Sequence, residues 1–98
     1  MKIIPQFRRA VAETIRHHRE LAGLTQPQLA ERIGGSEIGM RTWERAASAP
    51  SLETFLLLAN ALDVDAVELL RKIQGKMFLL QSWENESPQT SNQPNGSS

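Results

Sequence analysis

The stretch that decides the fold is 25-TQPQLAERIGGSEIGMRTWE-44, because it predicts two short helices joined by a glycine turn. Thr25 can cap the first helix, with Gln28 three residues later to return the hydrogen bond and Pro27 in the first turn. The pair Gly34-Gly35 ends that helix, since glycine adopts the left-handed backbone of a helix end without steric cost. The stretch therefore predicts a helix, a turn and a second helix.

The second helix has one anchored side and one varied side. Ser36 can cap it, and Met40 and Trp43 lie three residues apart, hence on one face. The other faces carry Glu37, Ile38, Arg41 and Thr42. A helix held by two large apolar side chains and presenting four different ones outward is typical of a surface that reads a partner.

Several of these positions follow the pattern of a known family. They are Gln26, Leu29-Ala30, Ile33-Gly34, Met40, Trp43 and Glu44, and further matches are Arg19, Gly23-Leu24-Thr25, Pro50-Ser51-Leu52, Ala59, Ala61-Leu62, Val64 and Leu69-Leu70. Together they cover about residues 10 to 72 and resemble the helix-turn-helix domain of the Xre family and the lambdoid phage repressors. The resemblance implies an all-α, five-helix repressor-like domain over residues 1–72.

The resemblance also implies roles for single residues. The positions that face bases in the family are Glu37, Ile38, Arg41 and Thr42. Those expected to contact phosphates are Gln26, Ser36, Arg45 and Ser48. Arg19 is expected to form a structural ion pair with Glu44, the residue that closes the second helix, the alternative being a solvated surface arginine. If the pair is buried, loss of one partner costs more than the pair contributes, because the other charge is stranded.

The four base-facing side chains differ in chemistry. Arg41 suits a bidentate contact with guanine O6 and N7, whereas Ile38 and Thr42 suit a thymine methyl group. Glu37 can accept a hydrogen bond from cytosine N4, or it can simply favour the positive end of the helix dipole. The sequence leaves both interpretations of Glu37 open.

The segment after the second helix departs from the family pattern. The family has glycine where Ala46 stands, and basic residues that touch phosphates often follow it. Here Ala47, Ser48 and Ala49 carry no charge, and alanine takes a left-handed backbone only with steric strain. Phosphate binding by this loop is therefore expected to be weak.

The remaining helices are expected to support this pair. Residues 5–22 predict a first helix with apolar residues at helical spacing along one face. Residues 52–61, capped by Ser51, predict a fourth helix that is apolar almost all round, which is typical of a buried central helix. Asp65 can cap a fifth helix.

The composition suits one small domain of balanced charge. The 98 residues are 40% apolar and include 11 basic and 11 acidic residues. Zero net charge does not by itself suggest a nucleic-acid partner, because affinity for DNA comes largely from Lys and Arg that neutralise phosphates. The arginines nevertheless crowd the first half of the chain: Arg8, Arg9, Arg16, Arg19, Arg32, Arg41 and Arg45. A local basic patch is compatible with this balance.

Several other kinds of protein are disfavoured. The chain has no Cys, and the neighbouring His17 and His18 point about 100 degrees apart on a helix, so no metal and no other cofactor is expected. The family usually has an aliphatic core residue at the position of His18, so the resemblance implies a partly buried histidine with a hydrogen-bond partner. No apolar run approaches the ~20 residues of a membrane span, and no grouping has catalytic spacing. We therefore expect a cytoplasmic protein that is not an enzyme.

The tract 70–83 is more apolar than a five-helix domain requires. Residues 73–83 predict an extension for dimerisation or for another partner, since an exposed apolar patch usually marks an interface. The residues predicted to contact this partner are Leu70, Ile73, Met77, Phe78, Leu80 and Trp83. The alternative is that the tract folds back on its own core. Residues 76–83 can form either a helix or a short strand.

From Glu84 the chain contains no apolar residue. Such a segment buries too little surface to offset its ordering entropy. Residues 84–98 are therefore predicted to be a disordered tail.

Two functions are compatible with this sequence. The first is a DNA-binding transcriptional regulator, a repressor that acts as a homodimer on a palindromic operator, with the helix 37–44 in the major groove. The second is an antitoxin-like or other interaction module that binds a protein partner such as a toxin through residues 70–83 and represses its own operon. Both functions use the same fold.

Overall fold

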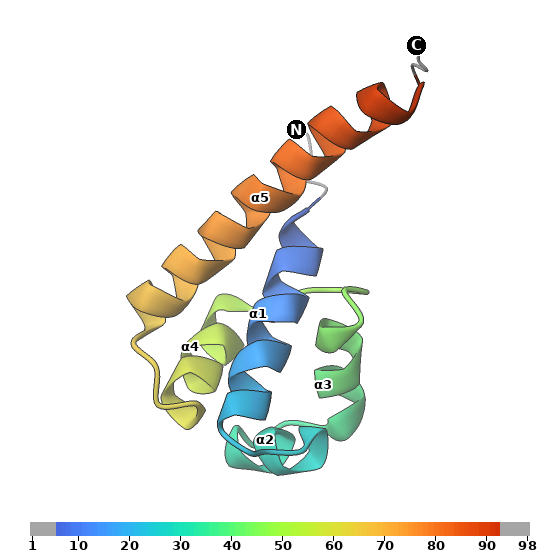
Figure 1. Cartoon of the computed structure of the whole chain (residues 1–98). Helices are drawn as coiled ribbons and strands as arrows, with labels where there is room; N and C mark the ends of the chain where they lie inside the picture. Colours follow the sequence, from blue (N-terminus) through green and yellow to red (C-terminus); the bar gives the residue numbers. More distant parts are fainter. Residues whose placement is uncertain (1–5, 93–98) are drawn as a thin grey trace.

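Five helices make up the part of the chain that the computed structural model describes, which is residues 6–92 for the backbone and 6–82 for the side chains. They are α1 (Phe7–Leu21), α2 (Gln26–Arg32), α3 (Glu37–Glu44), α4 (Leu52–Ala61) and α5 (Ala66–Asn92) (Figure 1). No strand occurs within residues 6–92. The predicted all-α, five-helix class is therefore confirmed.

Helix α1 lies at the centre of the arrangement (Figure 1). It packs against α3 on one side and α5 on the other, while α2 packs against α3 and α4. The core that these contacts enclose consists of Ala10, Val11, Ile15, Leu29, Ala30, Met40, Leu58, Leu62 and Ile73. Every helix contributes to this one core, so the position of α3 is fixed by the whole domain.

The helix starts follow the caps predicted from the sequence. Thr25 N donates to Gln28 Oε1 at 2.8 Å and Gln28 N donates to Thr25 Oγ1 at 3.2 Å, which completes a capping box. The Ser51 hydroxyl accepts from Thr54 N at 3.1 Å. Gly34 adopts a φ of 68° at the end of α2, where a side chain would be strained. Local sequence thus sets where the short helices begin and end.

Helix α5 passes through Gly75 without a break and projects beyond the other four helices (Figure 1). Residues 76–83 are therefore helical, which excludes the short-strand alternative. The helical backbone continues to Asn92, into the segment predicted as a disordered tail, and residues 93–98 of that segment lie outside the described residues. Within the described part of the chain, no helix is long and apolar enough to cross a membrane.

Candidate nucleic-acid interface

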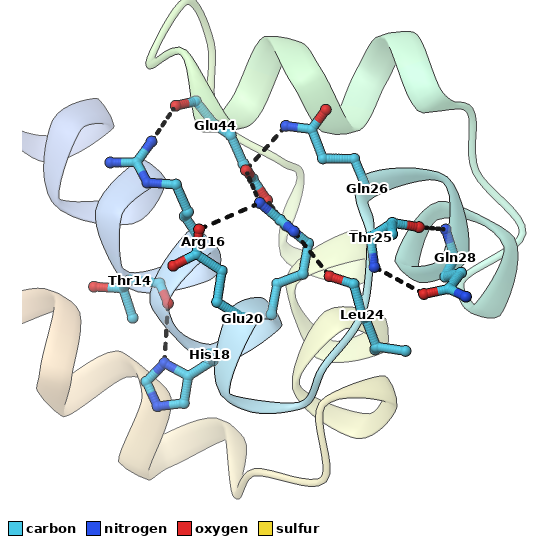
Figure 2. Close-up of polar contacts among 10 residues, drawn as sticks. Thr14, Arg16, His18, Glu20, Leu24, Thr25, Gln26, Gln28 and Glu44 are labelled. Carbon is cyan, nitrogen blue, oxygen red and sulfur yellow. Dashed lines mark hydrogen bonds and ion pairs between the residues drawn. The ribbon is translucent and has the colours of Figure 1, made fainter.

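The C-terminal end of α3 is held by a buried carboxylate. Glu44 accepts two hydrogen bonds from Arg19 of α1, from Nε to Oε2 at 2.6 Å and from Nη2 to Oε1 at 3.0 Å. Gln26, the first residue of α2, donates through Nε2 to the same Oε1 at 3.0 Å. Figure 2 shows Gln26 and Arg16 approaching Glu44 from opposite sides. The Glu44 carboxylate therefore joins α1, α2 and α3. It also holds the side chain of Gln26, a residue that is predicted to contact a phosphate.

The pairing of Arg19 with Glu44 is almost enclosed. The two side chains are 12% and 3% exposed, respectively. The hydrogen bond to Glu44 raises the pKa of Arg19, against the opposing effect of burial. Arg19 also donates through Nη1 to Leu24 O at 2.8 Å, which ties α1 to the segment that leads into α2. The structure thus contains the ion pair that the resemblance implies.

The residues predicted to read bases lie on the outer side of α3. Glu37, Ile38 and Arg41 are exposed and Thr42 is half-buried. On the inner side, Met40 is fully buried and Trp43 packs against the core. The outer side of α3 therefore presents charged, polar and apolar side chains, while the packing of its inner side holds the helix in place.

Glu37 and Arg41 are not independent of each other. Arg41 Nη2 lies 3.1 Å from Glu37 Oε2, and the side chains of Arg41 and Glu37 are 48% and 49% exposed. Thr42 Oγ1 donates to Ile38 O at 2.8 Å. Sequence reasoning treated each of these residues alone, although the spacing of four residues between Glu37 and Arg41 is the spacing at which helical ion pairs form. Two of the four residues predicted to contact bases, Glu37 and Arg41, thus form an ion pair with each other.

Ser36 caps the start of α3 by binding the amide of Gly39. Ser36 Oγ accepts from Gly39 N at 3.0 Å. A Cβ at position 39 would lie 3.2 Å from this oxygen and 3.8 Å from the ring of Trp43. A side chain at position 39 would therefore fit closely against Ser36 and Trp43. The phosphate contact of Ser36 stays a prediction.

The loop after α3 has the left-handed backbone that favours glycine, although the residue at the turn is Ala46. Ala46 has a φ of 63°, in the region that strains a residue with a Cβ. The amides of Ala46 and Ala47 donate to Trp43 O and Thr42 O, both at 3.1 Å, and so end the helix. The departure from the family pattern thus changes the residue but keeps the left-handed turn.

Two arginines of α1 reach this end of α3. Arg16 Nη1 donates to Glu44 O at 3.2 Å, and Arg8 Nη1 donates to Ala47 O at 3.1 Å. Arg45, which caps the helix, is exposed, and Ser48 is half-buried. Sequence reasoning noted the crowding of arginines but missed these contacts, because they depend on how α1 packs on α3.

The structure divides the predicted partner residues between core and surface. Ile73 is 1% exposed, and Met77 and Leu80 pack against the core as α5 continues along α1. Leu70 and Phe78 are exposed, Phe78 by 69%. The side chain of Trp83 lies outside the described residues. Ile73, Met77 and Leu80 are thus occupied within the chain, and among the predicted partner residues whose side chains are described, Leu70 and Phe78 are the exposed ones.

The two histidines have local roles in the described structure. Their rings meet edge to face with centroids 5.4 Å apart. The half-buried His18 has its Nδ1 at 2.9 Å from Thr14 O, which confirms the predicted hydrogen-bonded histidine. Among residues whose side chains are described, no group of three or more His, Cys, Asp or Glu could hold a metal ion.

The chain resembles known proteins both in sequence and in structure. Residues 10–71 match the profile of a family described as a helix-turn-helix domain. Two crystal structures of the clp gene regulator ClgR from Corynebacterium glutamicum resemble the chain. One is 26% identical with a TM-score of 0.80, covering 88% of this chain and 92% of that one. The other is 27% identical with a TM-score of 0.68, covering 74% and 95%. No curated protein sequence matches.

Proposed function

The chain belongs to the helix-turn-helix domain family, consistent with the Xre-like resemblance, and we propose that it is a transcriptional repressor that binds a palindromic operator as a homodimer. DNA binding and a regulatory role follow from the family and from the likeness to a transcription regulator. The proposal concerns the finer points: what is read, by how many copies, and with what effect on transcription.

The observation that carries the proposal is the rigid mounting of α3. Ser36 caps its start, Met40 is fully buried in its middle and the Glu44 carboxylate holds its end. A reading surface needs such support, because base recognition depends on side chains placed within fractions of an ångström. In the major groove, which admits an α-helix, Arg41 would bind guanine and Ile38 would meet a thymine methyl group.

A homodimer is supported by an apolar surface on α4 and α5. The exposed large apolar side chains of these two helices are Leu52, Leu56, Leu57, Val67, Leu70, Phe78 and Leu79. Between α1, α4 and α5 lies an apolar hollow of about 240 Å³, whose lining includes Phe7, Leu52, Phe55 and Leu70. Exposure of apolar side chains to water is unfavourable, so a surface of this kind indicates a binding partner. A second copy is the simplest partner, since two-fold operators match two-fold proteins.

Repression is the simplest outcome of operator binding by this domain. A protein bound across a promoter blocks polymerase by occupancy and needs no further contact. Activation, by contrast, requires a surface that recruits polymerase.

The test is fluorescence anisotropy of the protein with DNA from its own upstream region, across a salt series, with scrambled DNA as control. We expect a preference of about a thousandfold or more for one palindromic site and a linear dependence of log affinity on log salt. Weak binding that ignores sequence would overturn the proposal. In vitro transcription from the same promoter would then distinguish repression from activation.

A second candidate is an antitoxin-like module whose apolar surface binds a different protein. The observation that favours it is the same surface, which a toxin could cover instead of a second copy. Sedimentation of wild type, Phe78→Asp and Leu21→Asp separates the two. Leu21, on α1, is exposed to a similar degree and serves as control. A dimer lost only in Phe78→Asp supports the homodimer, and a wild-type monomer supports the second candidate.

A further inference from the structure

The positive charge of this domain is uneven once ion pairs are counted. Among the described side chains, the cations paired with carboxylates are Arg9, Arg19, Arg41, Lys72 and Lys76. Those that form no such pair in the same part of the chain are Arg8, Arg16, Arg32, Arg45 and Arg71. Arg8, Arg16 and Arg45 gather at the C-terminal end of α3. A chain of zero net charge thus carries a local basic cluster.

Arg8 is held at this cluster by one hydrogen bond. It lies in the first turn of α1 and is exposed, and its Nη1 donates to Ala47 O at 3.1 Å. A guanidinium carries five N–H donors. The bond to Ala47 therefore fixes the position of the charge and leaves the guanidinium able to bind an anion.

The proposed position of α3 indicates which anion this charge can meet. An α-helix with its side chains is ~10–12 Å in diameter and so fills the ~12 Å width of the major groove. The phosphates that border the groove then lie beside the helix and beside the segments that adjoin its ends, and contacts to them fix the orientation of the protein. The loop 46–49 follows the C-terminal end of α3 and carries no charge, yet Arg8 lies on it.

We propose that Arg8 contacts a DNA phosphate beside the loop 46–49 and supplies the positive charge that this loop lacks. This inference rests on the proposed function, because it requires α3 to enter the major groove. The ligand is the phosphodiester of the DNA backbone, so the contact positions the protein without reading sequence. The competing explanation is that Arg8 only braces the loop through Ala47.

The experiment is a salt series of binding to the operator and to scrambled DNA. The variants are Arg8→Gln, which keeps an N–H donor for Ala47 O but removes the charge, and Arg8→Lys, which keeps the charge. Arg9→Ala is the matched control, since Arg9 is the next residue and pairs with Glu13 at 3.2 Å. Thermal unfolding verifies that every variant is folded.

One lost phosphate contact should change the slope of log affinity against log salt by ~0.9. Arg8→Gln is therefore expected to show a slope shallower by ~0.9 and binding about fivefold weaker at ~0.15 M salt, equally on both DNAs. Arg8→Lys and Arg9→Ala should keep the wild-type slope.

Two results would overturn the inference. A wild-type slope in Arg8→Gln would leave Arg8 as a brace of the loop. An equally shallow salt dependence in Arg9→Ala would mean that arginines in this region act through the overall electrostatic field of the protein and not through one phosphate contact. Failure of the proposed function looks different: wild type would show no preference for the operator, while the slope on scrambled DNA would still decide the role of Arg8.

Discussion

Helix α3 carries two arginine–glutamate pairs of opposite character. At its C-terminal end, Glu44 pairs with Arg19 of α1 at 2.6 Å, and both side chains are almost buried. On its outer side, Glu37 pairs with Arg41 of the same helix at 3.1 Å, and both side chains are about half exposed. The chemical groups are the same, but one pair joins two helices, α1 and α3, and the other spans a single turn of α3.

The difference shows how one short helix combines support with recognition. The buried pair cannot exchange partners with solvent, because either charge alone would be desolvated without compensation. The exposed pair contributes little to stability, so its groups can leave each other for a base at small expense in free energy. Burial, more than residue type, decides which pair is structural.

The largest expected effect is on the buried pair. Glu44→Ala strands Arg19 and removes the acceptor of Gln26, so the free energy of unfolding should fall by about 3 kcal/mol or more. Urea denaturation followed by circular dichroism measures this change. The double variant Arg19→Met/Glu44→Leu should recover part of the loss, because it leaves no charge unpaired. A loss below ~1 kcal/mol in Glu44→Ala would contradict a structural role for the pair.

The next effect concerns binding and not folding. Arg41→Ala should weaken operator binding by roughly 1 to 3 kcal/mol and relax the preference at one base pair, while the unfolding free energy changes by less than ~0.5 kcal/mol. Anisotropy with a set of single-base operator variants measures both. Arg32→Ala, another exposed arginine, is the control and should preserve the preference. Equal weakening on every sequence would exclude base readout by Arg41.

A smaller effect is expected for the exposed pair as a pair. In a double-mutant cycle of Glu37→Ala and Arg41→Ala, the coupling in unfolding free energy should be about 0.3–0.5 kcal/mol and should vanish near ~1 M salt. The same cycle on operator affinity shows whether Glu37 reads a base or only orients Arg41. A coupling in stability above ~1.5 kcal/mol would remove the contrast between the two pairs.

The smallest expected effect is that of alkaline pH on the buried pair. Because the pKa of Arg19 is raised in the folded state, its contribution is complete below the ordinary arginine pKa and is lost only as the pH rises through the raised value. The stability difference between wild type and Arg19→Met should therefore be equal at about pH 7 and about pH 10. A difference that falls by half at the higher pH would contradict this assignment.

Local chemistry explains which parts of the fold were predictable. The capping box of Thr25, the cap at Ser36 and the glycine turn after α2 each depend on residues within a few positions, and each was predicted. The continuation of α5 through Gly75 was not, since a single glycine in an apolar pattern is compatible with a break. Beyond the glycine, Met77 and Leu80 pack against the core, which favours a continuous helix.

The residues of the candidate site also divide into those that local sequence or the family pattern predicted and those whose contacts depend on how the helices pack. The outward side of α3 followed from the helical period, and the pairing of Arg19 with Glu44 from the family pattern. The contacts of Arg8 and Arg16 join residues 39 and 28 positions apart, so no local pattern encodes them.

The eight-residue length of α3 has a thermodynamic consequence. Helices of this length do not persist alone in water, because nucleation is unfavourable and few bonds follow it. The proposed recognition surface therefore forms only when the whole domain folds, and DNA that binds it would draw the population toward the native state. At operator concentrations of ~100 times Kd, the complex should gain ~2.7 kcal/mol over the free protein. A destabilised variant can consequently be rescued by its own operator.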